Sequence, residues 1–327
     1  MTDKKVRFGI LSTAKIAEKQ LVPALNEAVN AELTAVASQS GKEKEAAQRW
    51  GAPFHYDDYR TLLKDPDIDA VYIPLPNSLH QKWAIEAMKN GKHVLLEKPA
   101  ALNSDDIIAI SSTAKEYNVQ WMEAFMYQFH PQHTYVKKLI QDGAIGKIKR
   151  FRSHFSFPLD LTSDNIRLNK ELGGGALFDV GCYCVHASRD LLDEEPLKVF
   201  SNARKLTEDG VDISSTSILT FEEADAVIDC SFDEPPSNYY EIIGTKGKIE
   251  VPHAFRPDEN PDQGEGIVIL KDANSQIVNE KRLGGNPYTL QVEHFADCVL
   301  QDKEPRYNGE KSYNNMKVIE ALYRSQG

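Results

Sequence analysis

The chain has 327 residues, of which 41% are hydrophobic and 27% charged, and its formal net charge is −11. At about 150 residues per domain, this length indicates two domains of ordinary globular composition. The negative charge and the lack of a long basic run argue against nucleic acid or a membrane surface as the main partner. The N-terminal apolar run is too short for a signal peptide and no stretch suits a membrane span, so we expect a cytoplasmic protein.

The first 125 residues alternate between predicted strands and predicted helices. Short apolar runs predict strands at 6–11, 32–38, 53–56, 69–73, 93–96 and 119–122. Helices are predicted between them at 14–25, 43–50, 58–63, 79–89 and 104–117, the last with Ser104 as its cap. Strand–helix units of about 30 residues are typical of β-α-β crossovers, so we expect an α/β domain with a doubly wound parallel sheet.

From residue 126 onward the pattern changes to strands with two different faces. In residues 147–157 the aromatic residues fall on one side and the polar residues on the other, namely Phe151, Phe155 and Phe157 against Arg150, Arg152 and His154. This alternation predicts a sheet with one solvated face. Further strands are expected at 198–206, 213–221, 226–232, 239–243, 248–251 and 266–270, and helices at 175–192, 289–300 and 311–324. The pattern favours an α+β domain on an open, mainly antiparallel sheet.

The turn after the first predicted strand is a candidate dinucleotide site, because a helix N-terminus there can bind a pyrophosphate. Small residues occupy the three positions of the usual glycine fingerprint, but two of the glycines are replaced, by Ser12 and Ala14. An ordinary strand-to-helix turn would explain the pattern about equally well. The candidate cofactor contacts in this turn are Ser12, Thr13, Ala14, Lys15 and Ile16.

The end of the second predicted strand bears on the choice of cofactor. An acidic residue there would bind the adenosine ribose and repel a 2′-phosphate. This chain has Ser38, Gln39 and Ser40 instead, followed by Lys42. We therefore expect NADP in preference to NAD.

Two further motifs carry candidate catalytic groups. Glu97-Lys98-Pro99 follows a central strand, where open α/β sheets bind their ligands, although a lysine at a strand end can also be a plain surface residue. Three glycines at 173–175 lead into a predicted helix on which Asp179, Tyr183 and His186 share a face. That face suits either the wall of a site or a buried helix whose polar groups bond one another. We expect no metal site, because the cysteine and histidine pairs nearby do not converge.

Four motifs in this order, Pro74–His80, Glu97–Pro99, Met122–Tyr127 and Gly173–Tyr183, resemble those of the Gfo/Idh/MocA oxidoreductase family. The resemblance is strongest to the branch of D-xylose dehydrogenases, dimeric dihydrodiol dehydrogenases and glucose–fructose oxidoreductase. It implies an NAD(P)-binding Rossmann domain over residues 1–125 and a substrate-binding and oligomerisation domain over residues 126–327. It also implies a homodimer or homotetramer formed through the second domain's sheet. Further cofactor contacts are expected at Pro74, Leu75, Asn77, His80, Glu97 and Lys98.

A hydride can leave a carbinol carbon only if the hydroxyl proton leaves as well. We hypothesise that Tyr183 takes this proton, that Lys98 stabilises the ionised phenol, and that Asp179 orients the substrate hydroxyl. Tyr127 and Arg167 are further candidates to line a pocket for a small sugar, polyol or dihydrodiol. The alternatives are a nicotinamide-binding regulator without turnover and a glycoside hydrolase that uses NAD transiently.

Overall fold

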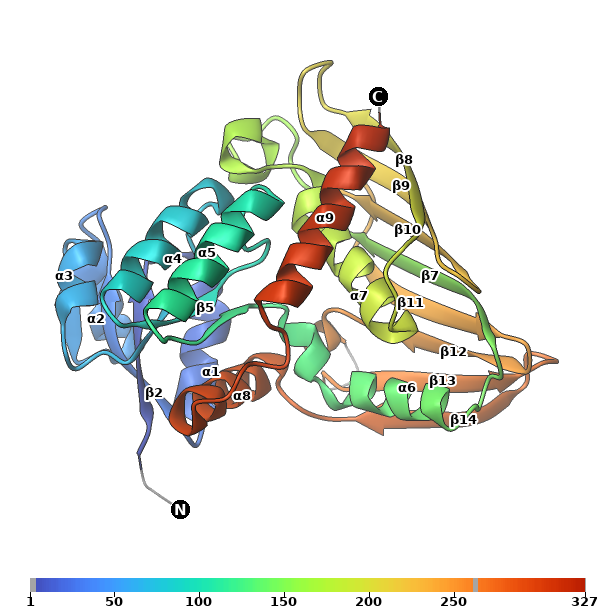
Figure 1. Ribbon diagram of the computed structural model, residues 1–327, viewed down its shortest axis with the longest axis horizontal. Helices are drawn as coiled ribbons and strands as arrows, with labels where there is room; N and C mark the ends of the chain where they lie inside the picture. The colour runs from blue at the N-terminus through green and yellow to red at the C-terminus, as the bar shows by residue number, and fades with distance from the viewer. Residues whose placement is uncertain (1–3, 261–263, 327) are drawn as a thin grey trace. The chain divides into compact units, whose positions relative to one another are not determined.

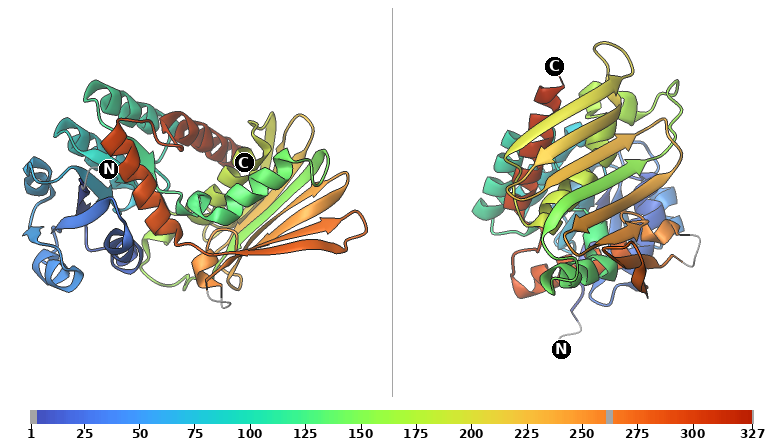
Figure 2. Two further views of the ribbon diagram at one scale, coloured as in Figure 1. Left: turned by 90° about the horizontal axis from the view of Figure 1, so that it is seen from below. Right: turned by 90° about the vertical axis from the view of Figure 1, so that its right-hand side faces the viewer.

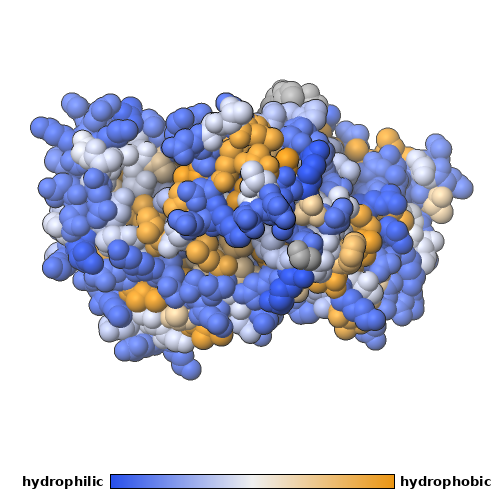
Figure 3. Space-filling view, turned by 90° about the horizontal axis from the view of Figure 1, so that it is seen from above, coloured by the Kyte–Doolittle hydropathy of each residue, from blue (hydrophilic) through white to orange (hydrophobic). Residues whose placement is uncertain are grey.

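The computed structural model describes residues 4–260 and 264–326, which divide into two compact units. The first combines the chain up to Met126 with Tyr288–Tyr313, and the second combines Tyr127–Pro287 with the chain from Asn314 onward. A search of the described helices finds none whose length and hydropathy suit a bilayer span. Hydrophilic side chains predominate on the face drawn in Figure 3, and hydrophobic ones form separate patches among them.

The first unit is built on a six-stranded sheet with strand order β3-β2-β1-β4-β5-β6. Neighbouring strands run parallel throughout, which confirms the predicted doubly wound sheet. All four residues of β4 are buried, as expected for a strand covered on both faces. The strands are β1 (Val6–Leu11), β2 (Ala31–Ala37), β3 (Phe54–Tyr56), β4 (Ala70–Ile73), β5 (His93–Leu96) and β6 (Trp121–Glu123).

Helices cover this parallel sheet, and Figure 1 shows α4 and α5 side by side over it. The helices are α1 (Val22–Glu27), preceded by a π-helical turn at Ala17–Leu21, α2 (Glu43–Trp50), α3 (Tyr59–Lys64), α4 (His80–Lys89) and α5 (Ser104–Glu116). The predicted cap of α5 is wrong by one residue. The side chain of Asn103 accepts a hydrogen bond from the Asp106 amide at 2.9 Å, so Ser104 already lies within the first turn.

Helix α8 (Pro287–Gln301) returns to this unit from late in the chain. Its Phe295 ring lies 6.3 Å from the Phe8 ring of β1, measured between centroids. The Asn30 amide, just before β2, donates to the Glu293 carbonyl at 2.9 Å and to the Asp297 carboxylate at 2.7 Å. An apolar contact and two hydrogen bonds thus attach a distant segment to the N-terminal sheet.

The second unit is built on an eight-stranded sheet with strand order β14-β13-β12-β11-β7-β10-β9-β8. Every neighbouring pair is antiparallel except β7 and β10, which confirms the prediction of a mainly antiparallel sheet. The strands are β7 (Ile148–Ser156), β8 (Lys198–Lys205), β9 (Asp212–Thr220), β10 (Asp225–Ser231), β11 (Ser237–Gly244), β12 (Gly247–Pro252), β13 (Gly266–Asp272) and β14 (Ile277–Leu283).

This sheet has one covered face and one open face, and Figure 2 shows the open face in its right-hand view. Helices α6 (Pro131–Gln141) and α7 (Cys182–Leu192) pack on the covered face, where Phe151 and Phe155 of β7 are buried. The alternate residues of β7 point outward, and Arg152 there pairs with Glu241 of β11 at 2.9 Å. The prediction of one solvated face is therefore confirmed. Helix α6 and strand β14 were not predicted from the sequence.

Candidate active site

The predicted cofactor residues of the first unit gather at one edge of its sheet. They follow β1, β2, β4 and β5, and the carboxyl ends of parallel strands meet at the same edge. Backbone hydrogen bonds join the turns in pairs: the Ser12 amide donates to the Ala37 carbonyl at 2.8 Å, and the Glu97 amide donates to the Ile73 carbonyl at 3.2 Å. Ligands of open α/β sheets bind at this edge.

Ser12, at the first position of the altered glycine fingerprint, has a backbone φ of 131°. Glycine adopts such an angle freely, whereas a residue with a Cβ atom pays for it in strain. The Ser12 hydroxyl oxygen accepts a hydrogen bond from the Ala14 amide at 3.0 Å. The turn thus adopts at Ser12 a backbone angle that favours glycine, and residues 12–16 are partly or fully exposed at this edge of the sheet.

The end of β2 offers hydroxyl and amide groups to a ligand. The hydroxyl oxygens of Ser38 and Ser40 are 2.8 Å apart, and Ser38 itself is buried. The Gln39 side-chain amide donates to a carboxylate oxygen of Asp58 at 3.4 Å. Sequence reasoning missed this acid, because it comes from the cap of α3 and not from the end of β2. The hydroxyl and amide groups at the end of β2 therefore lie beside a carboxylate that comes from a different element.

Lys98 follows β5 in a turn whose Lys98–Pro99 peptide bond is cis. The neighbouring Glu97 carboxylate accepts hydrogen bonds from the Tyr72 hydroxyl at 2.6 Å and from the Lys98 amide at 3.2 Å. The Lys98 side chain is partly exposed at the sheet edge described above. A cation there is placed to meet a ligand of the first unit.

His80, predicted as a cofactor contact, is fully buried and connects two of these turns. Its Nδ1 lies 2.8 Å from the Pro99 carbonyl oxygen and its Nε2 lies 2.7 Å from the Leu75 carbonyl oxygen. Burial lowers the pKa of His80 to about 4, so the ring is neutral at pH 7 and has one N–H to donate. The ring therefore spans the turns after β4 and β5 while only one carbonyl accepts its proton at a time.

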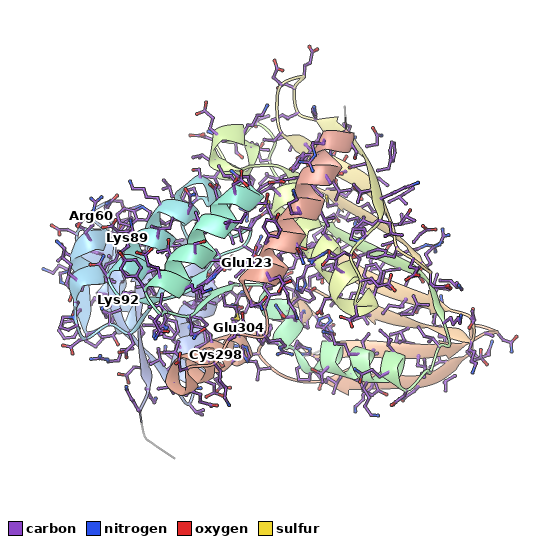
Figure 4. The ribbon with its side chains drawn as sticks, viewed as in Figure 1. Arg60, Lys89, Lys92, Glu123, Cys298 and Glu304 are labelled. Atoms are coloured by element: carbon purple, nitrogen blue, oxygen red, sulfur yellow. The ribbon has the colours of Figure 1, made fainter. Side chains whose placement is uncertain are left out.

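Glu123, at the end of β6, also holds the Lys98 turn and was not predicted (labelled in Figure 4). Its carboxyl oxygen accepts a hydrogen bond from the Ala100 amide at 2.9 Å. Complete burial raises the pKa of Glu123 to about 7, and the nearby charge of Glu97 adds to the shift. An acidic residue at the end of an otherwise apolar strand was the signal in the sequence that could have identified it.

Two of the predicted substrate residues come together in the second unit. The Arg167 Nε donates to an Asp179 carboxylate oxygen at 2.6 Å, and the Arg167 guanidinium lies 5.6 Å from the centre of the Phe157 ring. Asp179 belongs to the π-helical turn Leu177–Gly181, which continues into α7. A partly exposed, charged pair thus lies one turn before Tyr183, where it can bind hydroxyl groups of a ligand.

Tyr183 lies in a cluster of aromatic rings. Ring centroids of Phe155, Phe255 and Tyr127 lie 5.3, 5.6 and 5.7 Å from its own. Tyr127 is itself buried, and its hydroxyl group hydrogen-bonds to Nδ1 of His186. The polar groups of this helix face thus bond to neighbours, while Asp179 and Tyr183 lie four residues apart on it. Lys98 lies in the first unit and Tyr183 in the second.

Among the described residues, no three His, Cys, Asp or Glu side chains are grouped so that they could hold a metal ion. The strand order β3-β2-β1-β4-β5-β6 of the parallel sheet is the order found in dinucleotide-binding Rossmann domains. Residues 6–125 match the family pattern described as "Oxidoreductase family, NAD-binding Rossmann fold". Residues 133–250 match the "GFO/IDH/MocA C-terminal domain".

Similarity to known proteins extends over almost the whole chain. The chain is 36% identical to D-xylose 1-dehydrogenase (NADP(+)) 2 of Haloferax volcanii, covering 97% of this chain and 96% of that protein. It is 35% identical to trans-1,2-dihydrobenzene-1,2-diol dehydrogenase of Xenopus laevis, covering 90% and 89%. The chain therefore belongs to the Gfo/Idh/MocA oxidoreductase family, as its motifs predicted.

Solved structures agree with this assignment. A 3-ketoreductase from Actinomadura kijaniata, in complex with NADP and TDP-benzene, superimposes with a TM-score of 0.89 at 29% identity over 98% of both chains. An aldose–aldose oxidoreductase from Caulobacter crescentus, complexed with glycerol, gives a TM-score of 0.89 at 26% identity over 99% of this chain and 98% of that chain. The predicted fold class is confirmed.

Proposed function

We propose that this chain is a cytoplasmic, NADP-dependent oxidoreductase that transfers hydride between the nicotinamide and a hydroxyl or carbonyl carbon of a small sugar, polyol or dihydrodiol. The observation that carries the proposal is the Arg167–Asp179 ion pair, at 2.6 Å, one helical turn before Tyr183. The named relatives are dehydrogenases and reductases of such compounds, which favours turnover over a purely regulatory role and over glycoside hydrolysis.

The proposed chemistry divides its tasks between the two units. The turn at 12–16 and the neighbouring turns would hold NADP, whose nicotinamide would supply the hydride acceptor for the oxidation and, in its reduced form, the hydride for the reduction. In the oxidation, Tyr183 accepts the hydroxyl proton as the carbon–oxygen double bond forms, and in the reduction it returns that proton. Asp179, oriented by Arg167, accepts a hydrogen bond from a substrate hydroxyl. Lys98 supplies the positive charge that favours the ionised phenol.

The assignment of Tyr183 and Lys98 as the catalytic pair is also supported by a relative. Other structures of the Actinomadura kijaniata ketoreductase carry a tyrosine replaced by phenylalanine or a lysine replaced by alanine. A tyrosine and a lysine were thus selected for replacement in a relative with the same fold. In this chain we assign the corresponding tasks to Tyr183 and Lys98.

For the cofactor, we propose that the turn at 12–16 binds the pyrophosphate and that Ser38, Gln39 and Ser40 bind the 2′-phosphate of NADP. The proposed cofactor site is completed by residues of the turns after β4 and β5, namely Pro74, Leu75, Asn77, His80, Glu97 and Lys98. His80 is buried and contributes by holding the two turns together through the Pro99 and Leu75 carbonyls. We assign residues 1–125 to the dinucleotide and residues 126–327 to the substrate and to oligomer formation, with Tyr288–Tyr313 packed in the first unit.

The open face of the eight-stranded sheet is the proposed interface of a homodimer. In a homotetramer, pairs of subunits would form the same interface. Phe200 of β8 is 59% exposed and lies opposite Ile218 of β9, which is 43% exposed and lies opposite Val227 of β10. Such a row of apolar side chains across strands favours burial against a second copy. Sedimentation of the wild type as a dimer or tetramer, and of Ile218→Asp as a monomer, would support the interface. A monomeric wild type would overturn it.

The proposed activity is tested by following nicotinamide absorbance with aldoses, inositols, dihydrodiols and dicarbonyls, each with NADP and with NAD. We expect turnover with at least one sugar or diol and a higher kcat/KM with NADP. An absence of turnover with tight binding of NADP would indicate a regulator. Release of sugar from a glycoside without net change in absorbance would indicate a hydrolase.

A further inference from the structure

A buried carboxylate, Asp212, lies at the start of β9 in the second unit and plays no part in the proposed chemistry. It is 3% exposed, between Val211 and Ile213 in the sequence. One carboxylate oxygen accepts a hydrogen bond from the Leu177 amide at 2.6 Å. The other accepts one from the Tyr323 hydroxyl in α9 (Gly309–Ser325) at 2.8 Å. Burial raises the pKa of Asp212, while these hydrogen bonds oppose the shift.

The Asp212–Tyr323 pair packs directly against the glycine turn at 173–175. Gly175 has a φ of 121°, and a Cβ atom there would lie 2.3 Å from an Asp212 carboxylate oxygen and 2.8 Å from the Tyr323 hydroxyl oxygen. On the other side, a Cβ atom on Gly174 would lie 2.4 Å from the Arg167 carbonyl oxygen. The turn is therefore enclosed between the pair and the backbone of Arg167, which explains why glycines are required there.

The same turn connects to both members of the substrate-binding ion pair. The Gly175 amide donates to the Arg167 carbonyl at 2.9 Å, and the Gly175 carbonyl accepts from the Asp179 amide at 2.9 Å. The Leu177 amide that Asp212 binds lies between Gly175 and Asp179, in the first turn of the segment that leads to Tyr183. A shift of this turn would move Asp179, Tyr183 and the backbone of Arg167 together.

We propose that Asp212 and Tyr323 are positioning residues for substrate turnover: they fix the start of the helical segment so that Asp179 and Tyr183 lie correctly beside Arg167. The proposal rests on the proposed roles of these three residues. A pair that only stabilised the fold would lower stability when altered and leave the kinetics of the folded enzyme unchanged. A positioning pair also lowers kcat, because misplacement of a reacting group by about 1 Å can cost about 100-fold.

The test uses Tyr323→Phe, which removes one hydroxyl group and keeps the ring that packs near Phe178 at a centroid distance of 5.9 Å. We expect kcat/KM for the substrate to fall by about 10-fold or more, and the Kd for NADP to stay within about twofold of wild type. Asp212→Asn keeps one acceptor oxygen for the Leu177 amide. Its kcat/KM should lie between those of Tyr323→Phe and wild type. Wild-type kcat/KM in Tyr323→Phe would overturn the proposal.

Tyr240→Phe is a matched control in the same unit. Its phenol is fully buried, and its hydroxyl group bonds to Nδ1 of His133 at 2.9 Å, so the change deletes one buried oxygen without touching the glycine turn. We expect a comparable loss of thermal stability with wild-type kcat/KM. An equal loss of kcat/KM in Tyr240→Phe would show that any buried phenol has this effect and would overturn the specific role.

Amide hydrogen exchange separates this proposal from the proposed function, because it needs no substrate. In Tyr323→Phe the amides of Leu177 and Asp179 should exchange faster than in wild type, and in Tyr240→Phe they should not. Faster exchange without any enzymatic turnover would support the anchoring geometry while the proposed activity fails. Unchanged exchange at both amides would overturn the anchoring itself.

Discussion

The turn that carries Lys98 is held by polar groups, whereas the ring of Tyr183 is packed among other aromatic rings. Around Lys98, His80 contacts two backbone carbonyls and Glu123 accepts a hydrogen bond from the Ala100 amide. Burial shifts the pKa values of both side chains. Around Tyr183, the rings of Phe155 and Phe255 pack at centroid distances of 5.3 and 5.6 Å. The packing around the Lys98 turn depends on protonation and the packing around the Tyr183 ring depends on shape, so these two surroundings should respond differently to pH.

Tyr183→Phe should give the largest change in activity. It removes the proposed proton acceptor but keeps the ring that packs in the aromatic cluster. We expect kcat to fall by about 10²–10⁴-fold, the usual contribution of a positioned acid–base group. The Kd for NADP, measured by fluorescence titration, and the melting temperature should stay close to those of wild type. Undiminished kcat would exclude Tyr183 as the acid–base group.

Phe255→Ala should give the largest change in stability. Phe255 is fully buried, stacks on Phe155 at a centroid distance of 5.4 Å and meets Tyr127 edge-on at 5.0 Å. Deleting a buried aromatic ring costs about 3–5 kcal/mol in free energy of unfolding. Because no ionisable group is removed, denaturant unfolding should show the same loss at each pH. A loss that changed strongly with pH would contradict the description of this cluster as one held by shape.

Glu123→Gln should raise the free energy of unfolding, by an amount that changes with pH. The pKa of Glu123 is about 7 in the folded protein against 4.5 for an ordinary glutamate, so folding favours the protonated form. Its stabilising contribution is complete below the unfolded pKa and is lost as the pH rises toward 7. Gln stays neutral and can still accept the Ala100 amide, so between these pH values the variant should gain about 3 kcal/mol relative to wild type.

The measurement for Glu123→Gln is denaturant unfolding of the variant and of wild type across this pH range. Phe255→Ala serves as the control, because its difference from wild type should stay constant. Parallel stability curves for Glu123→Gln and wild type would show that Glu123 is ionised in the folded protein. The contrast between the pH-dependent surroundings of Lys98 and the shape-dependent surroundings of Tyr183 would then disappear.

The smallest effect is expected at Ser12. In most positions, replacing Ala by Gly costs about 0.5–1 kcal/mol, because Gly has more freedom in the unfolded chain. At position 12, where φ is 131°, Ala would retain the backbone strain and Gly would release it. Ser12→Gly should therefore be more stable than Ser12→Ala by about 1 kcal/mol in thermal unfolding. The ordinary order, with Ala the more stable, would mean that this turn is not strained.

The periodic parts of the chain were predictable, and the aperiodic parts were not. Strands β1 and β5 and helix α2 have the predicted bounds, because apolar runs and helical spacing report burial directly. Strand β14 was missed because six of its seven residues are exposed, so its sequence shows no alternation and only pairing with β13 makes it a strand. The sequence placed the fingerprint residues Ser12 and Ala14 in a turn, but it did not predict the backbone angle of Ser12.

The sequence alone determined the order of elements, the two kinds of sheet and the family, because burial periodicity and short motifs are local properties of the chain. Only the tertiary structure decided which buried groups hold the site. Asp212 meets the Leu177 amide across 35 positions, and Glu123 meets the Ala100 amide across 23. The tertiary structure also decided that α8 packs with the N-terminal sheet. Such contacts depend on which surfaces pack together, and a lone acidic residue in an apolar stretch does not reveal its partner.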